Sequence, residues 1–100
     1  MRDYEWSEPA LAAFSEFLDY LDERSLAASD RAETEIKATL SRLAERPYRG
    51  HRSRWPGLLE WSATDWSKII VYRELPDGIR IIAFYDARQD LSVVHPTPND

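Results

Sequence analysis

The sequence predicts an α+β fold, in which a helical hairpin packs on one face of a small antiparallel sheet, in the order β-α-α-β-β-β. Two observations indicate this class. Apolar residues recur at helical spacing over much of the first half of the chain, and at strand spacing over the second half. Runs of strands that are separated along the chain from a helical pair are typical of α+β domains. For 100 residues, we expect a single domain over residues 1–91 and a flexible polar tail over residues 92–100.

The first half is predicted to form a short strand followed by two helices. The strand covers residues 4–6, and Ser7 is the expected N-cap of a helix over residues 8–23, with an acid and a proline in its first turn. A second helix is expected from about residue 26 until Pro47, which restricts the residue before it. The linker is short, so the two helices should form an antiparallel hairpin. Their apolar stripes are Leu11, Phe14, Leu18 and Leu21, and Ala28, Ala32, Ile36, Leu40 and Leu43.

The second half is predicted to form three strands, at residues 57–62, 68–75 and 79–85. The last two should form a hairpin, because Pro76-Asp77-Gly78 is typical of a type I turn with a G1 bulge. The helical stripes need a surface to cover, and the sheet provides it. The expected core is Leu11, Phe14, Leu18, Ile36, Leu40, Leu43, Ile70 and Ile81.

Both faces of this hairpin are apolar. By simple alternation, Ile79, Ile81 and Tyr85 should share one face of the last strand, and Ile82 and Phe84 the other. A sheet with one face in water should alternate apolar and polar residues, and this one does not. Little of the chain is left over to cover the second face, so we expect a bound partner to cover it.

Composition argues against several classes of function. The chain has a net charge of −5 and no cysteine, and its two histidines, His51 and His95, lie far apart in sequence. We therefore expect no disulfide, no metal site and no cofactor. No apolar stretch is long enough to span a membrane and the N-terminal residues lack the apolar core of a signal peptide, so a cytoplasmic protein is predicted. The acidic balance disfavours a general nucleic-acid binder, while the arginines of residues 47–56 are either a solvated loop or a local basic patch.

An ordered set of short segments resembles the RelE/ParE superfamily of bacterial toxins from type II toxin–antitoxin modules, over nearly the whole chain up to Leu91. Each segment alone is common, and the set in this order is specific. The segments are Trp6-Ser7-Glu8-Pro9-Ala10 with Leu11, Leu43-Ala44-Glu45-Arg46-Pro47 with Arg49-Gly50, Pro56-Gly57 with Glu60, Ile69-Ile70-Val71-Tyr72-Arg73, Gly78-Ile79-Arg80-Ile81 and Arg88-Gln89-Asp90.

The resemblance implies a toxin that a cognate antitoxin neutralises through an extended, amphipathic segment laid across the sheet and helices. Two activities are known on this fold. ParE-like members inhibit DNA gyrase, and RelE-like members cut messenger RNA in the ribosome with the substrate's own 2′-hydroxyl as nucleophile. The second reaction needs a base, an acid and cations at the phosphate. A degenerate member that binds an antitoxin without toxicity is a third alternative.

Residue by residue, the resemblance favours the ParE-like activity. Asp86 stands where many members carry histidine, and Leu59 where many carry arginine, while the chain is acidic and poor in lysine. For an RNase, the candidate catalytic residues are Arg73, Arg88, Tyr85 and His51. For target or antitoxin binding, the candidates are Arg73, Tyr85, Asp86, Arg88, Gln89, Asp90, Leu91, Trp61 and Phe84. Alternatively, Arg73 pairs with Glu60 or Glu74 across the sheet, and Arg88 with Asp86 or Asp90.

Overall fold

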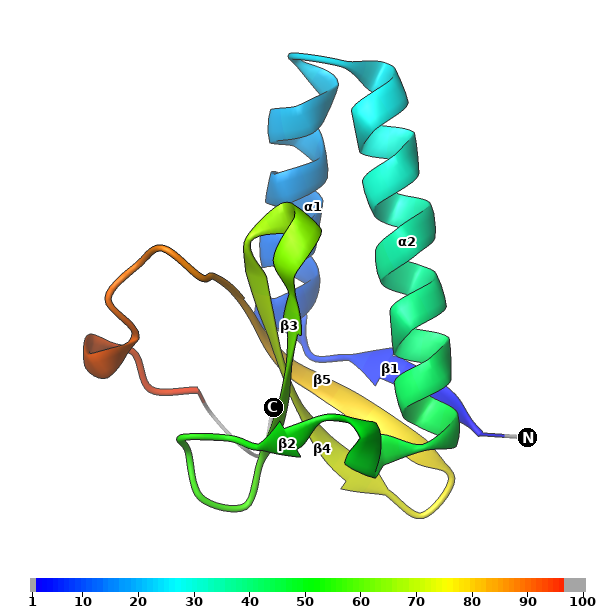
Figure 1. Ribbon diagram of the computed structural model, residues 1–100, viewed down its shortest axis with the longest axis vertical. Helices are drawn as coiled ribbons and strands as arrows, with labels where there is room; N and C mark the ends of the chain where they lie inside the picture. The colour runs from blue at the N-terminus through cyan, green and yellow to red at the C-terminus, as the bar shows by residue number, and fades with distance from the viewer. Residues whose placement is uncertain (1, 97–100) are drawn as a thin grey trace.

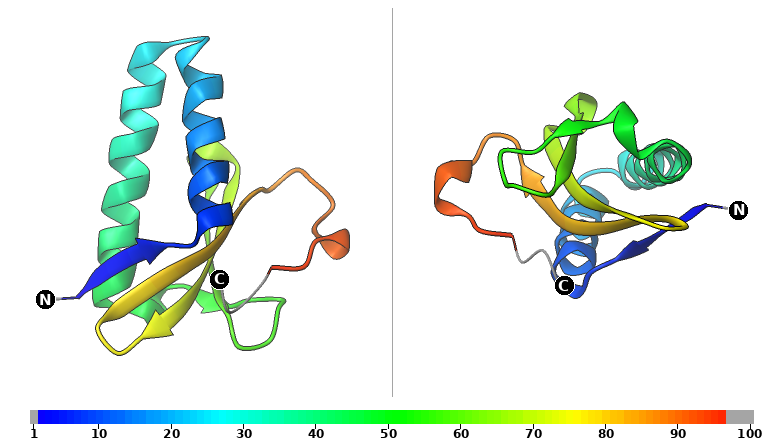
Figure 2. Two further views of the ribbon diagram at one scale, coloured as in Figure 1. Left: turned by 180° about the vertical axis from the view of Figure 1, so that it is seen from behind. Right: turned by 90° about the horizontal axis from the view of Figure 1, so that it is seen from below.

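The computed structural model describes residues 2–96, and its two antiparallel helices pack against one face of a five-stranded sheet (Figure 1). This arrangement confirms the α+β prediction. Figure 2 shows the C-terminal segment on the far side of the sheet from α2. The helices and strands are β1 (Asp3–Trp6), α1 (Glu8–Asp22), α2 (Leu26–Glu45), β2 (His51–Arg52), β3 (Leu59–Ala63), β4 (Lys68–Leu75) and β5 (Gly78–Asp86), with short 3-10 helices η1 (Pro47–Arg49), η2 (Thr64–Trp66) and η3 (Leu91–Val93).

The sheet is mixed, with strand order β1-β5-β4-β3-β2. It differs from the predicted antiparallel sheet because β1 runs parallel to β5, and because the two-residue strand β2 joins its edge. Most of the chain separates β1 from β5, so no local pattern sets their relative direction. Gly78 permits the pairing, since a Cβ there would lie 1.7 Å from the carbonyl oxygen of Asp3. Ser7 then fixes the exit of β1, donating its hydroxyl to the carbonyl of Ile82 at 3.1 Å.

A β-bulge in β5 changes which side chains face the helices. Val71 pairs with Ala83 and Tyr72 with Ile81, so Ile82 is an extra residue in β5. The extra residue reverses the alternation that follows it. Phe84 therefore packs with the residues that face the helices, whereas Tyr85 packs on the opposite face. The predicted faces of Phe84 and Tyr85 are wrong for this reason.

The helix-facing core lies between the helical hairpin and the sheet. Six of the eight predicted core residues are buried in it, namely Phe14, Ile36, Leu40, Leu43, Ile70 and Ile81. Leu18 is partly buried against the same core, but Leu11 is 47% exposed, so its predicted place in the core is wrong. Helix α1 instead turns Ala10 inward, with no exposed surface, because a small side chain lets the start of the helix approach the sheet.

The second face of the sheet is covered by the chain itself. Trp55, from the loop before β3, and Val94, from the C-terminal segment, pack over this face, and the indole Nε1 of Trp55 donates to the carbonyl of Val94 at 3.2 Å. The expectation that a partner must cover this face is therefore wrong. Of the residues assigned above to the tail, Val94 packs in this layer, and residues 97–100 lie outside the described residues. The outer core consists of Leu58, Ile69, Val71, Ile82, Ala83 and Leu91.

Among the described residues, no helix is both long enough and apolar enough to cross a membrane. In the same part of the chain, no group of histidine and acidic side chains is arranged to hold a metal ion.

Candidate functional site

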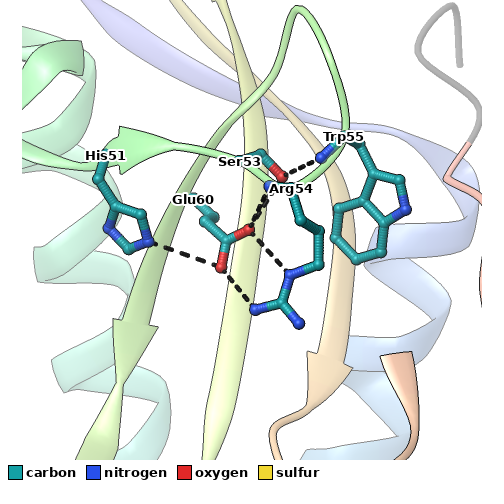
Figure 3. Close-up of polar contacts among 5 residues, drawn as sticks. All are labelled: His51, Ser53, Arg54, Trp55 and Glu60. Carbon is teal, nitrogen blue, oxygen red and sulfur yellow. Dashed lines mark hydrogen bonds and ion pairs between the residues drawn. The ribbon is translucent and has the colours of Figure 1, made fainter. Parts of the chain in front are cut away.

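Glu60 organises the arginine-rich loop at the edge of the sheet (Figure 3). Glu60 lies on β3 and is 2% exposed. The carboxylate accepts hydrogen bonds from Ser53 Oγ at 2.9 Å, from the backbone N–H of Arg54 at 3.2 Å, and from Nε and Nη2 of Arg54 at 3.3 and 3.0 Å. His51 Nε2 lies 3.7 Å from the same carboxylate. The loop is therefore folded around one buried acid.

Hydrogen bonds keep Glu60 ionised. Burial alone would raise the pKa of the Glu60 carboxyl, but hydrogen bonds from Arg54 and Ser53 outweigh burial and lower this pKa below its ordinary value. The charge of Arg54 is thus committed to a structural ion pair. The other two arginines of the cluster predicted in the sequence, Arg49 and Arg52, are exposed.

The pH dependence of stability should reveal this buried acid. Glu60→Gln is expected to lower the free energy of unfolding at pH 7 by about 1–3 kcal/mol, because Arg54 and Ser53 lose their charged acceptor. A carboxyl whose folded-state pKa is depressed stabilises the fold above its unfolded pKa, and this stabilisation is lost as pH falls through the folded pKa. The difference between variant and wild type should therefore shrink toward pH 3. Urea unfolding followed by circular dichroism at both pH values measures it.

Glu33→Gln is the matched control. Glu33 forms an exposed ion pair with Lys37, at 2.7 Å within α2. Such a pair contributes only about 0.3–0.5 kcal/mol, so this variant should remain close to wild type at both pH values. A Glu60→Gln deficit that is as large at pH 3 as at pH 7 would contradict the ionised state of Glu60.

Arg73 has neither of the partners that the sequence suggested. Glu60 is occupied by Arg54, and Glu74 accepts the hydroxyl of Tyr48 at 2.6 Å. The Nε of Arg73 is buried and has no hydrogen-bond partner among the described residues. Its neighbour across the sheet is Arg80, which forms an ion pair with Glu5. Arg73 thus places a partly buried guanidinium on the same face as the outer core.

The end of β5 turns sharply around Asp86. The Asp86 carboxylate accepts three hydrogen bonds from Arg88, at 2.9 Å from the backbone N–H, 3.0 Å from Nε and 2.9 Å from Nη2. These bonds hold the pKa of the Asp86 carboxyl well below its usual range. Of the two acids suggested for Arg88, the structure selects Asp86, because Asp90 instead caps η3 through Ser92. The Arg88 side chain remains 77% exposed, so its guanidinium is both fixed and presented to solvent.

A cavity of about 450 Å³ opens beside this turn, between α1 and the ends of β4 and β5. Four of the predicted binding residues line it, namely Phe84, Asp86, Arg88 and Gln89, together with the unpredicted Lys68, Phe17, Tyr20 and Trp66. The signal for Lys68 was present in the sequence. Lys68 is two residues before Ile70 in the same strand, so its side chain lies on the same face of the sheet, the face that meets the helices.

The other candidate residues are dispersed. Trp61 packs at the margin of the helix-facing core, and Leu91 is buried in the outer core. The ring of Tyr85 packs tilted against that of Trp55, with centroids 5.6 Å apart, and burial raises the pKa of its phenol. Among the described residues, no hydrogen bond or ion pair joins any two of the four RNase candidates, Arg73, Arg88, Tyr85 and His51.

Comparison with known proteins gives a match to a family model and likeness to solved structures. The model of the family described as "ParE toxin of type II toxin-antitoxin system, parDE" matches residues 4–91. A solved structure described as "Chromosomal ParDE TA system from P. aeruginosa" has a similar fold, with a TM-score of 0.75 and 19% sequence identity, over 88% of this chain and 98% of that chain. No curated protein matches the sequence.

Proposed function

The chain belongs to the ParE toxin family of type II toxin–antitoxin systems, and from this membership we propose that it is a cytoplasmic toxin that inhibits DNA gyrase and is neutralised by a cognate antitoxin. The observation that carries the choice of target is the turn around Asp86. It fixes Arg88 as an exposed cation beside an aromatic cavity, which suits recognition of a protein surface.

The arrangement of the RNase candidates also supports this choice. Cleavage of a messenger would require a base, an acid and cations that converge on one phosphate. Tyr85 is instead partly buried against the outer core, and Arg88 is paired with an ionised carboxylate that would repel a phosphate. One observation favours ribosome-dependent messenger cleavage as the second candidate, namely the partly buried guanidinium of Arg73 with its unpartnered Nε.

Expression and supercoiling assays test the proposal together. The chain expressed alone should inhibit growth, and co-expression with the small protein encoded in the neighbouring reading frame should restore growth. The purified chain should inhibit supercoiling of relaxed plasmid by gyrase, and prior mixing with the neighbouring protein should remove the inhibition. Benign high-level expression, or unaffected supercoiling together with ribosome-dependent messenger cleavage, would contradict the proposal.

A further inference from the structure

We propose that the cavity between α1 and the ends of β4 and β5 receives an acidic side chain of the antitoxin, with Lys68 as the cation that binds it. This inference rests on the proposed function, and it deepens that function by naming the chemistry through which the antitoxin is recognised.

Lys68 is a cation for which the described residues supply no hydrogen-bond acceptor. It is the first residue of β4, is partly buried, and points toward the helical hairpin. Its ammonium lies 4.8 Å from the ring centroid of Phe17 and 5.5 Å from that of Phe84. It forms no hydrogen bond or ion pair with any described residue, although all three of its N–H groups are donors.

The nearest acid does not supply that acceptor. Asp86 is the cross-strand neighbour of Lys68, but three hydrogen bonds from Arg88 hold its carboxylate. Burial lowers the pKa of the Lys68 amine, and the attraction of Asp86 offsets this only in part. A carboxylate that enters the cavity would give Lys68 a charge-assisted hydrogen bond, which is among the stronger polar contacts in proteins.

The walls of the cavity restrict what can enter. Phe17, Trp66 and Phe84 present aromatic surface around Lys68, so the ligand needs an apolar stem as well as its acidic group. Glu16 also lines the cavity, and the exposed side of α1 carries further acids. These acids would repel a polyanion such as RNA, whereas a single carboxylate can pair with Lys68. The occupant that fits is a glutamate or aspartate flanked by apolar residues, as in an amphipathic peptide segment.

A small carboxylate tests the site without the antitoxin. The chain has only two lysines, so Lys68 and the exposed Lys37 can be followed separately by NMR after labelling of lysine. Titration with 3-phenylpropionate should shift the Lys68 signals and raise the pKa of its amine, and it should perturb the indole of Trp66. The neutral analogue 3-phenylpropionamide should cause neither change. Binding of the amide as tight as that of the acid, or no response of Lys68 to the acid, would overturn the inference.

Antitoxin binding provides the second arm. Lys68→Met should weaken binding of the neighbouring reading frame's product about 10-fold or more, because the entering carboxylate would lose its charged partner. Lys68→Arg should retain most of the affinity, and Lys37→Met should match wild type. If wild type binds and Lys68→Met binds as tightly, this inference fails while the proposed function stands. If wild type does not bind at all, the proposed function fails, and the carboxylate titration still decides whether Lys68 binds a carboxylate.

Discussion

Phe14→Ala is expected to lower the free energy of unfolding by about 3–5 kcal/mol, the usual cost of removing a buried phenyl ring. Phe14 is 3% exposed and joins three elements. Its ring stacks on that of Trp6 from β1, with centroids 4.9 Å apart, and meets the ring of Phe84 from β5 edge-on at 5.5 Å. The cavity left by alanine would remove both aromatic contacts. Urea unfolding of the variant and wild type, followed by circular dichroism, measures the loss.

Leu11→Ala is the matched control, one turn earlier on the same helix. The sequence pattern predicts that Leu11 and Phe14 are equally buried, but Leu11 is 47% exposed. Its truncation should therefore cost less than about 1 kcal/mol, as for most surface substitutions. Similar losses for the two variants would contradict the observed orientation of α1, in which Phe14 is buried and Leu11 is exposed.

Local signals explain why the helices were predicted accurately. Ser7 caps α1 by accepting a hydrogen bond from the backbone N–H of Ala10 at 3.2 Å, as the sequence suggested. Pro47 lies just beyond α2, which ends at Glu45, and Ser25 caps its start. Each of these boundaries depends on residues that are near one another in the chain.

Features that depend on distant parts of the chain were missed. Spacing alone favours Leu11 over Ala10 as a core residue, and only the close approach of α1 to the sheet makes the smaller residue the buried one. Similarly, alternation cannot reveal that Ile82 is an extra residue, since the bulge appears only in the pairing of β5 with β4. That single residue decides whether Phe84 faces the helices and lines the cavity beside Lys68.

In the candidate site too, contacts between residues close in the chain were predictable and contacts between distant residues were not. The pairing of Arg88 with Asp86 joins residues two positions apart, and the sequence offered it as one of two alternatives. The role of Glu60 was missed, because an acid in a strand gives no sign that a loop will fold around it. Sequence alone could not show which surface Trp55 packs on, since it covers the second sheet face together with the C-terminal segment that returns to meet it.

Arg88→Ala is expected to weaken gyrase inhibition by roughly 30-fold, the effect of removing an arginine that dominates a protein interface. The ion pair with Asp86 fixes the Arg88 guanidinium while leaving its side chain 77% exposed, so little ordering is needed when a target binds. Arg73→Ala should change inhibition by less than about threefold, because the Nε of Arg73 is buried beneath its neighbours and inaccessible to a protein surface. Supercoiling of relaxed plasmid, titrated with each purified variant, gives the comparison.

Arg24→Ala is the matched control, since Arg24 is an exposed arginine near the tip of the helical hairpin, whose guanidinium lies over the ring of Tyr20. It should inhibit gyrase as wild type does.

A different set of results would identify an RNase. In that case wild type would cleave messenger RNA on the ribosome, and both Arg73→Ala and Arg88→Ala would lower the rate on the order of 10²–10³-fold, since each would remove a cation that stabilises developing phosphate charge. The exposed, fixed guanidinium of Arg88 predicts that Arg88→Ala alone loses gyrase inhibition. Arg73→Ala should leave antitoxin binding and the free energy of unfolding unchanged.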